Sequence, residues 1–153
     1  GAVGRQVAGT AGALGMEVVA ADPAVRDADV PLVDLETLLA SSDAVTLHVP
    51  LADNTRGMIG AAQLDRMRPQ ALLVNTSRGG LVDERALAQA LAAGRIGGAA
   101  FDTFEREPPE ASPLLTLDNF IASPHAGAAT MEAARRTGVA AVRELLAGRP
   151  SGP

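Results

Sequence analysis

The chain has 153 residues, of which 47% are hydrophobic, and a formal net charge of −5, which is the size and apolar content of one domain with its own core. The acidic balance and the lack of basic runs argue against nucleic-acid binding, and no apolar run approaches the roughly 20 residues of a membrane span. Without cysteine there is no disulfide framework, thiolate metal site or cysteine nucleophile. We therefore expect a cytoplasmic protein that binds no membrane, nucleic acid or metal and acts on a small molecule.

Apolar segments of strand character alternate along the chain with segments of helical pattern. Asp34 and Asp83 each precede a helical segment, as a helix N-cap does. Alternating strands and helices, with strands that are almost continuously apolar, predict an α/β fold with a parallel sheet covered on both faces. The predicted strands are 17–21, 44–49, 71–75, 97–101 and 119–122, and the predicted helices are 35–40, 60–67, 84–94 and 130–146, the last with Met131, Ala134, Val142 and Leu145 on one face.

The first residues resemble a dinucleotide-binding fingerprint whose front is missing. Gly1 and Gly4 have the spacing of the second and third glycines of G-x-G-x-x-G, and Asp22 follows a predicted strand 18 residues after Gly4. The glycines let the backbone approach a pyrophosphate at a helix N-terminus. An aspartate at that distance binds the adenosine ribose hydroxyls and repels a 2′-phosphate, which predicts NAD. The alternative is a glycine-rich helix start followed by a surface aspartate.

This interpretation implies an N-terminally truncated Rossmann-type doubly wound sheet, without its first strand and the first glycine of the fingerprint. We expect residues 1–148 to form a partial NAD-binding domain and 149–153 to be a tail leading toward a substrate-binding domain. In the strand order 3-2-1-4-5-6 the missing strand is central, so the second strand and the strand across the switch point should lack a partner. We expect the isolated chain to be catalytically inert and poorly stable.

Polar residues follow four of the predicted strands, where ligands bind in such sheets. They are His48, the turn "NTSRGG" with Arg78, Asp102, and His125 in "SPHAG". The planar guanidinium of an arginine suits a carboxylate, to which it can donate two parallel hydrogen bonds. Glu107 lies before two prolines, which restrict its backbone to extended conformations. Taken singly, His48 also fits a packed strand end, and Glu107 a solvated acid in a charged loop.

Together these stretches resemble the NAD-binding domain of the D-isomer-specific 2-hydroxyacid dehydrogenases, which include phosphoglycerate dehydrogenase and the glyoxylate/hydroxypyruvate reductases. The resemblance rests on "GAVGRQVA", "GMEVVAADP", "SSDAVTLHVPLADNTRGMI", "LLVNTSRGGLVDERAL", "GGAAFDTFEREPP" and "SPHAG". The family's catalytic residues correspond to Arg78, Glu107 and His125. Its cofactor contacts correspond to Gly1, Ala2, Val3, Gly4, Asp22, His48, Val49, Pro50, Thr76, Ser77, Arg78, Asp102, His125, Ala126, Gly127 and Ala128. Ala2 departs from the family, which usually has arginine there.

The resemblance implies an NAD-dependent oxidoreductase that moves a hydride between the nicotinamide and C2 of a D-2-hydroxy or 2-keto acid, such as 3-phosphoglycerate, glyoxylate or hydroxypyruvate. His125 would exchange a proton with the C2 oxygen, Glu107 would bind the far ring nitrogen, and Arg78 would hold the substrate carboxylate. It also implies a homodimer as the full-length parent.

Three other functions compete with this one. The C-terminal-binding-protein co-repressors resemble the same family and keep its NAD site, so an NAD(H)-binding interaction module stays open. Formate dehydrogenase resembles the family but carries glutamine where Glu107 lies, which argues against it. A serine hydrolase is disfavoured because neither Ser77 nor Ser123 lies in a G-x-S-x-G turn.

Overall fold

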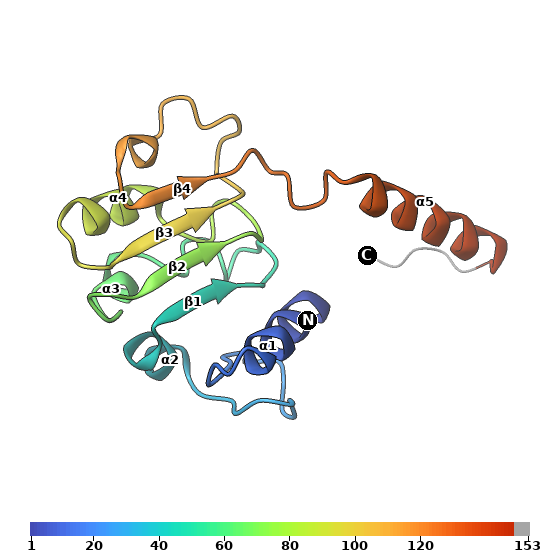
Figure 1. Cartoon of the computed structure of the whole chain (residues 1–153), viewed down its shortest axis with the longest axis horizontal. Helices are drawn as coiled ribbons and strands as arrows, with labels where there is room; N and C mark the ends of the chain where they lie inside the picture. Colours follow the sequence, from blue (N-terminus) through green and yellow to red (C-terminus); the bar gives the residue numbers. More distant parts are fainter. Residues whose placement is uncertain (149–153) are drawn as a thin grey trace.

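The computed structural model describes residues 1–148 and contains one parallel sheet (Figure 1). The strands lie in the order β1-β2-β3-β4, and all neighbours are parallel. The pairing aligns Leu47 with Asn75, Asn75 with Phe101, and Phe101 with Ala122. The residues that follow the four strands therefore emerge at one edge of the sheet. The strands are β1 (Ala44–Leu47), β2 (Leu72–Asn75), β3 (Gly98–Phe101) and β4 (Phe120–Ala122).

The predicted helices form, with ends within a few residues of the predicted ones. Asp34 accepts a hydrogen bond from the Thr37 N–H at 2.7 Å, and Asp83 accepts from the Arg85 and Ala86 N–H groups at 3.0 Å each, so both are N-caps. The helices are α1 (Ala2–Ala13), α2 (Leu35–Ser41), α3 (Ala61–Leu64), α4 (Glu84–Ala92) and α5 (Met131–Leu146), with a 3₁₀ turn, η1 (Pro113–Thr116).

The hydrophobic core lies between one face of the sheet and the layer formed by α3, α4 and η1. Alternate strand residues such as Leu73 and Phe101 point into it, and Leu87 of α4 and Leu114 of η1 are fully buried against them. The ring of Phe101 lies 5.5 Å from that of Phe120, in an edge-on arrangement. The ring of Phe104, also in the core, lies 6.1 Å from that of Phe101. The rest of the core is aliphatic, as the composition predicts.

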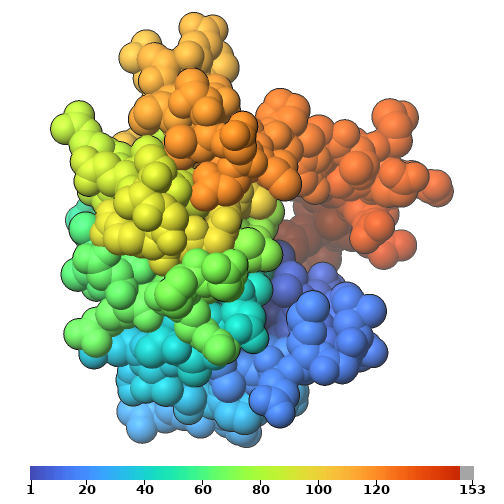
Figure 2. All heavy atoms as spheres, turned by 60° about the vertical axis from the view of Figure 1, so that its left-hand side comes forward, coloured from blue at the N-terminus to red at the C-terminus, as the bar shows by residue number. Residues whose placement is uncertain are grey.

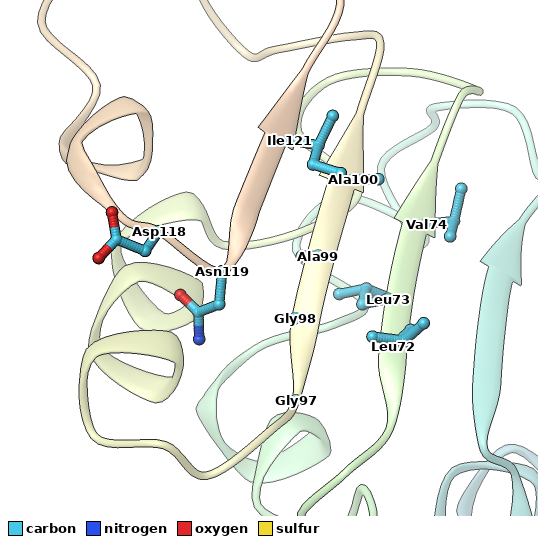
Figure 3. A pocket seen from close by; sticks show the side chains of 10 residues that line it. All are labelled: Leu72, Leu73, Val74, Gly97, Gly98, Ala99, Ala100, Asp118, Asn119 and Ile121. Carbon is cyan, nitrogen blue, oxygen red and sulfur yellow. The ribbon is translucent and has the colours of Figure 1, made fainter.

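The opposite face of the sheet is open, so the prediction that helices cover both faces is wrong for residues 1–148. Leu72 and Ile121 are 49% and 70% exposed, and with Val74 and Ala100 they line a shallow apolar depression (Figure 3). Helix α5 leads away from the sheet (Figures 1 and 2) and contains no buried residue. Its predicted apolar face is therefore exposed, because the segment after β4 carries the helix past the sheet.

The predicted strand 17–21 does not form. Only Ala20 pairs, in an isolated bridge to Leu32, and the Ala20 N–H donates to the Pro31 carbonyl at 2.9 Å. In the described part of the chain β1 has one neighbour, β2. The predicted tail 149–153 lies outside the described residues.

No helix within residues 1–148 is both long and apolar enough to cross a bilayer.

Replacing the α4 cap tests the helix that supports the core. Asp83→Ala removes two hydrogen bonds to the first turn, and loss of such a cap costs about 1 kcal/mol, or roughly 2–4 °C in melting temperature. Asp53→Ala, at an exposed turn residue, should leave the melting temperature within a degree or so. Thermal melting of the complete protein measures both, and equal melting temperatures would show that the cap contributes nothing.

Candidate functional site

The carboxyl edge of the sheet brings together the polar residues that the sequence singled out. His48 follows β1, the turn with Arg78 follows β2, Asp102 follows β3, and the segment with His125 follows β4. The predicted grouping at one edge is confirmed by the parallel pairing.

His125 and Glu107 form a hydrogen-bonded pair. The distance from His125 Nδ1 to Glu107 Oε2 is 2.8 Å, as the sequence predicted, and the two side chains are 51% and 38% exposed. The bond from His125, together with the Phe104 N–H that donates to Oε1 at 3.0 Å, lowers the pKa of Glu107 below its ordinary value. Glu107 is therefore a carboxylate at neutral pH and accepts from Nδ1–H. In the neutral ring, Nε2 then carries the free lone pair.

His125 is held by an unusual backbone conformation. Its φ is 52°, the one positive value among the described residues other than glycine. Such left-handed backbone costs an L-residue about 1–2 kcal/mol, so surrounding contacts have to enforce it. The His125 N–H donates to the Ser123 carbonyl at 3.0 Å, across Pro124. Pro124 and this hydrogen bond, which spans only two residues, make the turn stiff.

Asp102 supplies the contacts that enforce this turn. Its Oδ1 accepts from the Ser123 hydroxyl at 2.5 Å and the Ala126 N–H at 2.8 Å, and its Oδ2 accepts from the Gly127 N–H at 2.9 Å. These bonds, the Ser123 hydroxyl first, lower the pKa of Asp102 although burial opposes them. Asp102 is 6% exposed. A carboxylate so placed clamps the residues on both sides of His125.

The turn that carries Arg78 is held from below by Asn75, which is fully buried. The Asn75 amide donates to the Arg78 carbonyl at 2.9 Å and accepts from the Ser77 N–H at 3.1 Å. The Ser77 hydroxyl donates to the Val49 carbonyl at 2.8 Å, which ties this turn to the residues after β1. The Arg78 guanidinium is exposed and donates to the Ser77 carbonyl at 2.7 Å.

Arg78 is connected to Glu107 and His125 through backbone packing. Within residues 1–148 no hydrogen bond or ion pair joins Arg78 to Glu107 or His125. Instead, the Arg78 turn packs on the loop that carries Glu107. A Cβ at Gly79 would lie 1.9 Å from the Phe104 carbonyl oxygen, so the two backbones touch.

Glu84, in the first turn of α4, anchors the same loop. Its carboxylate accepts from the Glu105 N–H at 2.7 Å, and burial raises its pKa. Glu84, like Asn75 and Ser123, received no positioning role from the sequence. Asn75 and Ser123 each occur at a strand end beside a predicted site residue, which is a signal that could have marked them.

The N-terminal residues lie beside His48, at the end of β1. Helix α1 begins after Gly1 with no side-chain cap and no acid in its first turn, and a Cβ on Gly4 would lie 3.5 Å from that of His48. Burial lowers the pKa of His48, whose Nε2 lies 3.1 Å from the Thr46 hydroxyl. The uncapped N–H groups suit an anion such as a phosphate.

Asp22 is half-buried at the end of the predicted strand 17–21. Its Oδ1 accepts from the Ala24 N–H at 2.9 Å. In the described part of the chain its Oδ2 has no hydrogen bond and can accept from a ligand hydroxyl. Of the remaining predicted contacts, Ala2 and Val3 are the first residues of α1, and the others follow β1, β2 and β4 at the carboxyl edge; these others are Val49, Pro50, Thr76 and Ala128.

Comparison with known proteins gives one consistent result. The family described as "D-isomer specific 2-hydroxyacid dehydrogenase, NAD binding domain" matches residues 1–127. Glycerate dehydrogenase of Methylorubrum extorquens is 49% identical over 98% of this chain and 49% of its own length. The chain thus spans about half the length of such relatives.

Solved structures agree with that match. D-lactate dehydrogenase with NAD⁺ from Lactobacillus jensenii has a TM-score of 0.90 at 30% identity, over 99% of this chain and 52% of its own. An acyclic imino acid reductase in complex with NADPH and D-Arg also has a TM-score of 0.90 at 30% identity, over 99% and 50%. These similarities confirm the predicted fold class.

Acid should weaken the Asp102 clamp. Because the pKa of Asp102 is lowered in the fold, the ionised carboxylate stabilises the protein above the unfolded pKa of about 3.9, and this stabilisation is lost as pH falls through the folded value. Asp102→Asn should lower the melting temperature at pH 7 and reduce the fall in melting temperature between about pH 5 and pH 2.

The matched control is Asp53→Asn, which should follow the unaltered protein throughout. Parallel pH curves for Asp102→Asn and the unaltered protein would contradict a stabilising role for the ionised carboxylate.

Proposed function

The chain belongs to the D-isomer-specific 2-hydroxyacid dehydrogenase family, and we propose that its parent protein reduces a 2-keto acid to a D-2-hydroxy acid, and catalyses the reverse reaction, with NAD(H). The His125–Glu107 hydrogen bond at the carboxyl edge carries this proposal. The substrate class is a small 2-keto acid such as hydroxypyruvate, glyoxylate or a phosphorylated equivalent.

The residues of this chain fit the cofactor. The uncapped start of α1, between Gly1 and Gly4, offers N–H groups to the pyrophosphate, and the free oxygen of Asp22 suits a ribose hydroxyl. Since Ala2 has no charged side chain, the pyrophosphate would be held by backbone alone at this point. When bound, NAD(H) supplies the hydride chemistry.

The His125–Glu107 pair provides the proton. In the direction of reduction, protonated His125 donates from Nε2 to the C2 oxygen as that oxygen gains negative charge; in oxidation, neutral Nε2 accepts the hydroxyl proton. Glu107, ionised and bonded to Nδ1, fixes which ring nitrogen faces the substrate and stabilises the protonated ring. The hydrogen bond to Glu107 holds the imidazole, and the Asp102 bonds hold the backbone that carries it.

Arg78 provides the substrate anchor. It is exposed at the edge, and its bond to the Ser77 carbonyl leaves guanidinium N–H groups for a carboxylate. Such an anchor fixes the C2 carbon relative to His125, which converts binding energy into orientation.

We place these residues in a larger protein, with 1–148 as its partial dinucleotide-binding domain and a substrate-binding domain outside the chain. The length of the relatives supports this arrangement. We also propose that the parent protein is a cytoplasmic homodimer, as the family resemblance implies.

Substitutions in the pair and the anchor should have different kinetic effects in the complete protein. His125→Asn keeps a residue type that tolerates positive φ but removes the imidazole, so kcat with hydroxypyruvate and NADH should fall by about 10²–10⁴-fold. Arg78→Ala removes a charge-assisted bond, so KM for the keto acid should rise roughly 10- to 100-fold.

Steady-state kinetics measure both effects, and NADH affinity and melting temperature show whether each variant is folded. Tight NADH binding without turnover of any 2-keto acid by the unaltered protein would instead favour the interaction module. Unchanged kcat in His125→Asn would remove His125 from the reaction.

Cofactor choice tests the role of Asp22. The carboxylate should repel a 2′-phosphate, and the nearest arginine in the sequence, Arg26, lies beyond Pro23, so the complete protein should bind NADH more tightly than NADPH. Asp22→Ser should narrow that preference by weakening NADH binding and removing the repulsion. Titration of nucleotide fluorescence measures all four affinities. Equal or tighter NADPH binding by the unaltered protein would contradict the role of Asp22 in selecting NAD(H).

A further inference from the structure

Asn75 has a place at the site that is not explained by packing alone. It is one of three buried polar side chains within residues 1–148, with Asp102 and Thr103, and it is completely inaccessible to solvent. A buried amide without partners is costly, and Asn75 meets this requirement entirely within the Arg78 turn. Its amide N–H donates to the Arg78 carbonyl and its oxygen accepts from the Ser77 N–H.

The backbone of Asn75 connects the same point to the other half of the site. The Asp102 N–H donates to the Asn75 carbonyl at 2.9 Å, in continuation of the β2–β3 pairing. Asp102 in turn clamps the residues around His125. Asn75 therefore binds Asp102, which holds the His125 segment, through its backbone. It binds the Arg78 turn through its side chain.

We propose that Asn75 is a positioning residue, whose amide sets the direction in which Arg78 leaves the sheet edge and so the place of the substrate carboxylate relative to His125. The inference rests on the function proposed above. Without the amide, the turn would be tied to β2 by backbone continuity alone.

The close contact at Gly79 limits where the Arg78 turn can lie. Because a Cβ there would lie 1.9 Å from the Phe104 carbonyl oxygen, the Arg78 turn has no free space on the side of the Glu107 loop. The Phe104 N–H in turn binds the Glu107 carboxylate. The turn thus packs against the loop at Gly79 and is hydrogen-bonded to Asn75, so loss of the Asn75 bonds removes one of the contacts that set its position, while the Ser77 bond to the Val49 carbonyl remains.

Asn75→Asp in the complete protein tests the proposal through pH. A carboxylic acid can accept from the Ser77 N–H and donate to the Arg78 carbonyl, whereas a carboxylate has no donor for that carbonyl. Burial raises the pKa of the introduced acid toward neutral. The ratio of KM for hydroxypyruvate, variant over unaltered protein, should therefore be within about 2-fold of one at the acidic end of the range and rise to roughly 10-fold as pH increases.

Two readouts separate positioning from a general loss of structure. NADH affinity and kcat should change far less than KM in Asn75→Asp. The matched control is Asn119→Asp, since Asn119 is a half-buried asparagine whose amide donates to the Leu91 carbonyl at 3.2 Å, at the opposite end of the sheet. Its KM ratio should stay near one at every pH.

Asn75→Ala introduces no charge and serves if the aspartate variant does not fold; its KM should be raised roughly 10-fold at all pH values. A KM ratio near one for a folded Asn75→Ala, or equal losses of NADH affinity and keto-acid affinity, would overturn the positioning role. Absence of turnover in the unaltered protein would overturn the proposed function itself, and the role of Asn75 with it.

Discussion

The parallel pairing of the four strands is the constraint on which the site depends. Because Leu47, Asn75, Phe101 and Ala122 are in register, four loops from distant parts of the sequence begin at the same level. A shift of β4 by two residues along β3 would keep its side chains on the same faces but move His125 by about 7 Å. It would also separate Ser123 and Ala126 from Asp102. The hydrogen bonds of the sheet thus determine the chemistry as directly as the side chains at its edge do.

Buried and half-buried polar side chains fix the positions of the loops that begin at this edge. Asp102 holds the segment around His125, Asn75 holds the turn of Arg78, and Glu84 holds the loop of Glu107. In each case a side chain on a regular element or at its end binds backbone groups of a loop. A buried polar group left unpaired costs about 1–3 kcal/mol, so each of these side chains favours the one loop conformation that satisfies it. The exposed His125, Glu107 and Arg78 are thus positioned by residues that are themselves less exposed: Asp102 and Asn75 are buried and Glu84 is half-buried.

Much of this organisation could be predicted from the sequence. The strands β1 to β4, the capped helices after Asp34 and Asp83, and the grouping of site residues at one edge follow from local patterns and from the rule that ligands bind where parallel strands end. The contact between His125 and Glu107 was also predicted, through the family resemblance. Local patterns could not predict which segments pair as strands. Residues 17–21 have strand composition, yet only Ala20 among them forms a backbone pair. The open sheet face escaped prediction for a related reason, since the apolar stripe of α5 says that the helix can cover a surface but not which one. The role of Asn75 depends on a turn geometry that a motif does not reveal.

The left-handed backbone at His125 sets the folding stability of the turn against the proton-transfer role proposed for the imidazole. Glycine, or asparagine to a lesser degree, would occupy this backbone with less strain, so a lineage selected only to remain folded would gain stability by discarding the imidazole. The Asp102 clamp would serve any of these three residues equally, because its bonds reach Ser123, Ala126 and Gly127 and not residue 125 itself. The imidazole at this position therefore lowers the stability of the turn without being needed for its shape.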